Sequence, residues 1–174
     1  SRGPTRGGRI KPDIVAPGTM VVSLRTQTPP NKDDWFVDDM ESGAGDWTAT
    51  DDWALVTSEV HGGVHAWHDS PGGDYAEGIN TTLTSPVIDL SGGASGWKAL
   101  RFWIRYELAD GDDWFLDFSS DGGIKWRSFG PFTGNQPDWQ LVSVTLKKLA
   151  HQSQFRFRFR LETNQDGNTG DGLY

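Results

Sequence analysis

The sequence lacks the features of several large protein classes. It contains no cysteine in 174 residues, which excludes disulfide bonds and thiolate metal sites. It has 16 Lys and Arg residues and 24 Asp and Glu residues, which gives a net charge of −8. This balance excludes nucleic acid as a partner, because its binders need a basic surface. No run reaches the ~20 apolar residues of a membrane span, and no segment keeps the apolar period of a helix.

The residues that are abundant favour an all-β fold. The chain has 22 Gly and 9 Pro together with 9 Trp and 9 Phe, a combination of many turns and many β-prone aromatics. Short alternating segments between turn signals predict nine strands: Trp35–Met40, Trp53–Thr57, Val64–Trp67, Thr82–Leu90, Lys98–Leu108, Trp114–Ser119, Ile124–Phe129, Trp139–Leu146 and Gln154–Leu161. Strands of this number and spacing indicate a two-sheet antiparallel sandwich or jelly roll.

Two strands alternate especially clearly between apolar and charged residues. Lys98–Leu108 and Gln154–Leu161 each place one apolar side toward a core and one charged side outward. If both charged sides share one sheet face, they form an aromatic and cationic surface for a glycan or an acidic peptide. The candidate ligand-binding residues are Arg101, Trp103, Arg105, Arg156 and Arg158, with Arg160 beside them. The alternative is that neighbouring carboxylates cover this face.

The first 25 residues differ from the rest and resemble a protease segment. They are basic, and a polar linker with two prolines follows at 26–32. The run Gly8-Arg9-Ile10-Lys11-Pro12-Asp13-Ile14-Val15-Ala16-Pro17-Gly18-Thr19 resembles the stretch before the nucleophile of subtilisin-like serine proteases. The resemblance covers Ser1–Leu24 and implies that the remainder of a parent protease is a partner of this chain.

The catalytic residues of that family are missing from the sequence. The nucleophile of that family lies in a Gly-Thr-Ser-Met-Ala turn. Here Gly18-Thr19 is followed by Met20 and Val21 instead, so Ser23 is not assigned as a nucleophile. The family's Asp and His are absent, and none of the four histidines (His61, His65, His68 and His151) lies in its histidine motif. A serine without its base is inert at neutral pH, so we expect this chain to have no protease activity.

Residues 33–174 resemble MAM-like jelly-roll modules of secreted bacterial peptidases. The resemblance rests on several weak motifs in order: Phe36-Val37-Asp38-Asp39-Met40-Glu41, then Leu83-Thr84-Ser85-Pro86-Val87-Ile88-Asp89-Leu90, then Ser119-Ser120-Asp121-Gly122-Gly123, and Gly172-Leu173-Tyr174. It implies that the last strand is truncated. The module would then be either inserted in the protease, ahead of its nucleophile, or appended to it.

Acidic residues from separate segments are candidates for a calcium site. Ca²⁺ takes several carboxylate and carbonyl oxygens, usually from different loops. The resemblance to MAM-like modules implies a cation near Asp39 and Glu41, with Asp69 as a weaker candidate, and Asp171 would join them if the first and last strands are neighbours. The alternative is that these residues simply occupy turns.

The sequence therefore supports one main hypothesis about function and one alternative. The main hypothesis is a secreted, non-catalytic β-sandwich that helps a subtilisin-like endopeptidase to bind substrate or surface, or stabilises it. The alternative is a calcium-dependent carbohydrate-binding or adhesion module without a proteolytic role. The sequence identifies neither the protein or glycan ligand nor the oligomeric state.

Overall fold

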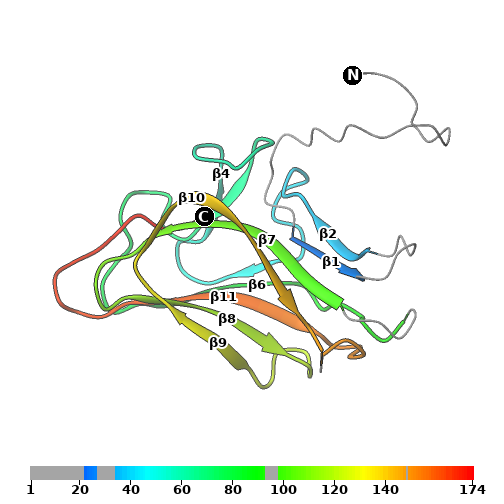
Figure 1. Ribbon diagram of the computed structural model, residues 1–174. Helices are drawn as coiled ribbons and strands as arrows, with labels where there is room; N and C mark the ends of the chain where they lie inside the picture. The colour runs from blue at the N-terminus through cyan, green and yellow to red at the C-terminus, as the bar shows by residue number, and fades with distance from the viewer. Residues whose placement is uncertain (1–21, 27–33, 93–97, 148) are drawn as a thin grey trace, which may run out of the picture.

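A computed structural model describes residues 22–26, 34–92, 98–147 and 149–174 (Figure 1). Predictions on residues 1–21 and 27–33 lie outside this part of the chain. The described residues form twelve strands and no helix. The strands are β1 (Val22–Thr26), β2 (Asp34–Asp38), β3 (Thr48–Ala49), β4 (Ala54–Val56), β5 (Ala66–His68), β6 (Asn80–Thr84), β7 (Lys98–Glu107), β8 (Asp113–Ser119), β9 (Arg127–Phe132), β10 (Asn135–Thr145), β11 (Arg156–Glu162) and β12 (Gly172–Leu173).

The strands form two five-stranded sheets and a small hairpin. The first sheet has the order β10-β7-β1-β2, with β12 also paired to β7, and the second has the order β3-β6-β11-β8-β9. Strands β4 and β5 pair only with each other. In Figure 1 the first sheet lies above the second, with the β4–β5 hairpin beside the first sheet. The protein is thus an all-β antiparallel sandwich, as the sequence predicts.

The core lies between the two sheets and comes from the alternation seen in the sequence. Phe102 and Ile104 of β7 are buried, and so are Phe157 and Phe159 of β11. The Phe102 and Phe159 rings meet edge to face with centroids 4.9 Å apart, which joins the two sheets. The residues between them in sequence turn outward, so each strand has one core side and one outer side.

Strand β1 comes from the predicted protease-like segment but belongs to the sandwich. Its backbone pairs with β2 on one side and with β7 on the other. Residues 22–24, the described part of the stretch that resembles a protease segment, therefore lie within the first sheet between two other strands. Strand β12 pairs with β7 as well, opposite Tyr106 and Glu107.

Two predicted strand boundaries shift and one strand was not predicted, each for an identifiable reason. Strand β6 ends at Thr84 because Pro86 has no N–H to donate to a ladder. Beyond it only Ile88 forms an isolated bridge, with Phe155. Strand β9 begins at Arg127 because Asp121 Oδ1 accepts the backbone N–H groups of Ile124 and Lys125 and holds them in the turn. The two-residue β3 is too short for sequence alternation to reveal.

Candidate ligand-binding sites

The outer side of the first sheet carries a group of aromatic residues. Trp103 points outward from β7 between the buried Phe102 and Ile104. Leu141 of β10 lies directly opposite it in the sheet, with about half of its surface (49%) exposed. An apolar side chain this exposed, beside a tryptophan, forms an apolar patch open to solvent.

The loop between β4 and β5 extends this group. It brings the His61 ring onto Trp103 in a stacked arrangement with centroids 3.8 Å apart, and His61 also meets Trp139 edge to face at 5.6 Å. Desolvation lowers the pKa of His61 and so favours its neutral imidazole. We call Trp103, Trp139, Leu141 and His61 the aromatic platform.

Charged groups border the aromatic platform at Arg105. Its guanidinium lies 2.5 Å from a Glu59 carboxylate oxygen and 3.3 Å from one of Asp171. The Tyr174 ring packs under the guanidinium at 4.4 Å, and its hydroxyl donates to Asp171. Glu59 itself has a left-handed backbone, with φ of 57°. Such strain in a non-glycine residue gathers at functional sites, and here it places a carboxylate at the edge of the platform.

The second arginine group lies on the other side of the molecule. Strands β7 and β11 belong to different sheets, so Arg101, Trp103 and Arg105 do not share a face with Arg156 and Arg158. The expectation of one joint face was wrong. Alternation shows which residues of a strand point the same way, but it does not show in which sheet the strand lies.

The arginines of β11 have partners within their own sheet. Arg158 and Arg160 each donate through Nε to Asp117, whose side chain is almost fully buried. Burial opposes the ionisation of Asp117, but hydrogen bonds from Ser128 and the two arginines outweigh it and hold its pKa below the usual value. Arg158 also covers the Trp126 ring at 4.3 Å, and Arg156 donates to the Ser85 carbonyl. This face is therefore occupied mainly by its own ion pairs.

The predicted calcium ligands have separate protein partners. Glu41 Oε1 accepts the backbone N–H groups of Val64 and His65, which lowers the Glu41 pKa. Asp39 accepts the N–H of Glu41, and Asp171 binds Arg105 as described. Among the residues that the structure describes, no group of three or more His, Cys, Asp or Glu is arranged to hold a metal ion. Calcium stays a prediction from sequence.

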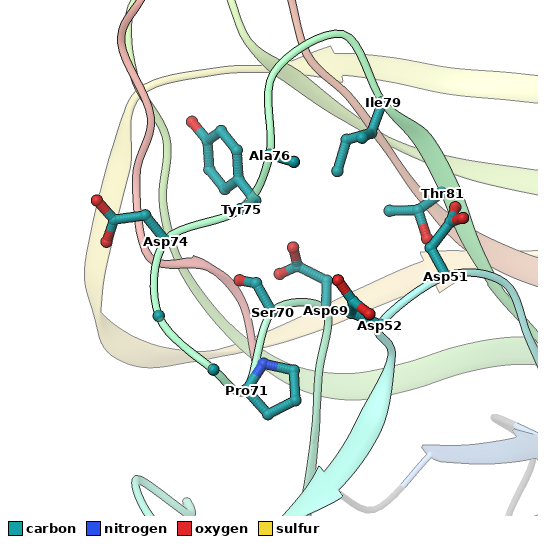
Figure 2. A pocket seen from close by; sticks show the side chains of 12 residues that line it. Asp51, Asp52, Asp69, Ser70, Pro71, Asp74, Tyr75, Ala76, Ile79 and Thr81 are labelled. Carbon is teal, nitrogen blue, oxygen red and sulfur yellow. The ribbon is translucent and has the colours of Figure 1, made fainter.

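Asp69 lies apart from the other three predicted ligands, in a pocket. Its Oδ1 accepts the N–H of Leu173 at 2.5 Å, which ties the end of β5 to β12. Its Oδ2 is buried and has no hydrogen-bond partner among the described residues. Burial raises the Asp69 pKa to about 7. The pocket has a volume of about 530 Å³, and Figure 2 shows the Asp69 carboxyl group directed into it.

Sequence reasoning missed most of the residues that complete these two sites. His61, Glu59 and Trp139 reach the platform through loop packing and a strand bulge, which leave no periodic signal. Asp51 and Asp52 line the pocket from the turn before β4. The Gly72-Gly73 pair was the one available sign, because it marks the tight turn that forms the pocket rim.

Comparisons with known proteins support the fold. No family model matches the sequence, and no curated protein matches it either. A solved structure of the carbohydrate-binding module TmCBM61, in complex with β-1,4-galactotriose, is similar with a TM-score of 0.51 and 19% identity. The match covers 78% of this chain and 91% of that chain. At this identity the likeness shows a shared β-sandwich. Among the described residues no helix is long and apolar enough to cross a membrane.

Proposed function

We propose that this protein is a non-catalytic glycan-binding module. The observation that carries the proposal is the aromatic platform on the outer side of the β10-β7-β1-β2 sheet. Tryptophan rings offer flat apolar surfaces against which sugar rings pack, and the exposed carboxylate of the nearby Glu59 keeps lone pairs that can accept hydrogen bonds from sugar hydroxyls. The fold likeness to a module solved with a galactose oligosaccharide gives the proposal independent support.

The parent of this module, as we propose it, is a secreted subtilisin-like protease. That step rests on the resemblance of residues 1–24 and not on the fold. A glycan-binding module would hold such an enzyme near a glycosylated substrate or surface and raise the local substrate concentration. Calcium would remain a stabilising ion through Asp39 and Glu41, to be tested by melting curves with calcium and with chelator.

Substitution of Trp103 by alanine tests the proposed glycan site. We expect Trp103→Ala to weaken binding of an oligosaccharide roughly tenfold or more, the size of effect of a tryptophan at the centre of an interface. The measurement is titration calorimetry with β-1,4-galactotriose, after a neutral-oligosaccharide array has identified any tighter ligand. Retention of the wild-type circular dichroism spectrum would show that the sandwich is intact.

Trp126→Ala is the matched control. Trp126 is partly exposed and lies on the outer side of the second sheet, under Arg158. We expect this variant to bind the oligosaccharide as the wild type does. If Trp126→Ala loses binding and Trp103→Ala keeps it, the site is on the arginine face of β11 instead. If no oligosaccharide on the array binds at millimolar concentration, the protein is not a glycan-binding module.

A further inference from the structure

The pocket beside Asp69 is acidic, and no residue of the aromatic platform lines it. The twelve residues that line it come from the turn before β4, the loop after β5 and the start of β6. They include Asp51, Asp52 and Asp69, and none of the lining residues that the structure describes is basic. Asp74 also lines the pocket, but Figure 2 shows its carboxyl group pointing away. The exposed carboxylates of Asp51 and Asp52 give the pocket a negative potential.

Asp69 is the group that indicates a ligand. Its side chain is 2% exposed, and Oδ2 has no partner although Oδ1 is hydrogen-bonded. An unpaired oxygen on a buried carboxylate is costly and calls for an explanation. Figure 2 shows the Asp69 carboxyl group directed into the pocket, which Asp52 also lines. A donor in the pocket would therefore satisfy Asp69 and be attracted by Asp52.

The size and walls of the pocket favour a small organic ligand. A volume of about 530 Å³ is within the range of small-molecule sites. Ile79 and the ring of Tyr75 provide apolar wall. The Tyr75 hydroxyl donates to Asp112 at 2.6 Å and accepts from the Ala109 N–H. The hydrogen bonds of this hydroxyl hold the wall in place, and the aspartates are the charged groups of the pocket.

A metal ion fits this arrangement less well than a protonated amine. Ca²⁺ takes six to eight oxygens at once, whereas the described residues contain no cluster arranged as a metal site. A primary ammonium group has only three donors to satisfy, and a hydrogen bond between two charged groups is about twice as strong as a neutral one. We infer that this pocket binds a ligand through a protonated primary amine that donates to Asp69 Oδ2, with Asp51 and Asp52 at the entrance.

Such an amine occurs on an amino sugar and on a lysine side chain, and a titration separates these sources. The probes are glucosamine, Nα-acetyl-lysine methylamide, and N-acetylglucosamine as the matched neutral sugar, each added to the ¹⁵N-labelled protein at about pH 7 and low salt. We expect saturable NMR shift changes at the amides of Asp69, Ser70 and the Gly72-Gly73 turn with at least one of the two amines. N-acetylglucosamine should give none at the same concentration.

Two variants show which carboxylates carry the binding. Asp69→Asn keeps an acceptor for the Leu173 N–H but removes the charge, and we expect it to weaken amine binding roughly tenfold or more. Asp52 is exposed at the rim, so Asp52→Asn leaves the fold unchanged and should weaken binding about two- to threefold. Asp46→Asn is the matched control, because Asp46 is exposed and does not line the pocket. It should bind as the wild type does.

Three results would overturn the inference. Equal shifts with N-acetylglucosamine would show a site for neutral sugars. Calcium chloride that shifts the same amides and displaces the amine at lower concentration would show a metal site. No shift with either amine would show that the pocket does not bind this class of ligand. Because Trp103→Ala leaves the pocket intact, failure here is separate from failure of the aromatic platform as a glycan site.

Discussion

Replacing Phe157 by alanine should lower the free energy of unfolding by about 3–5 kcal/mol, the usual cost of a large cavity in a core. Phe157 is fully buried near the start of β11. Its ring lies between that of Phe155, which immediately precedes β11, and that of Phe159 within β11, and it meets Trp47 edge to face at 5.6 Å. No neighbour can fill the space without leaving its own contacts, so the cavity persists.

Urea unfolding followed by tryptophan fluorescence measures this loss. The midpoint should move to a lower urea concentration, while the slope of the unfolding free energy against urea concentration stays constant, as for a change in stability alone. Phe129→Ala makes the same chemical change at a phenylalanine that is 50% exposed, and it should cost less than about 1 kcal/mol. Equal losses in the two variants would mean that the packing around Phe157 does not form the core.

The sequence predicted the architecture because the strands that build the core are amphipathic. In β11, Phe157, Phe159 and Leu161 alternate with arginines, and this order alone determines which side is buried. The pairing of β8 with β9 was also foreseeable, because Asp121-Gly122-Gly123 supplies the positive φ angles of a tight turn. Local patterns of this kind do not depend on the rest of the chain.

The candidate sites were less predictable because they depend on contacts between distant segments. Trp103 was a candidate, but nothing near His61 indicates that its loop folds back onto β7. The two arginine groups looked equivalent in sequence and lie on opposite sides of the molecule. The burial of Asp69 depends on β12, which is about a hundred residues further along the chain. A single sequence contains no local signal for these contacts.

The buried carboxyl group of Asp69 should make the protein less stable as the pH rises from about 4 to about 7. Desolvation raises its folded-state pKa from 3.8 to about 7, against hydrogen bonds that favour the charged form. Between these two values the folded state binds more protons than the unfolded state, so stability falls with increasing pH. One pKa unit corresponds to about 1.4 kcal/mol, which gives a total loss of about 4 kcal/mol.

Asp69→Asn isolates this contribution from the other titrating groups. Carboxylates such as Asp117 and Glu41 have lowered pKa values and add stability as the pH rises, so the wild-type curve alone mixes opposite slopes. Asparagine has the same shape and does not titrate. Both proteins are unfolded in urea between about pH 4 and pH 8. The free energy of unfolding of the variant, relative to that of the wild type, should rise by up to about 4 kcal/mol over this range, with most of the rise complete by about pH 7. Two parallel curves would show that Asp69 titrates near its ordinary pKa in the folded protein, and that its carboxyl group is hydrated or paired.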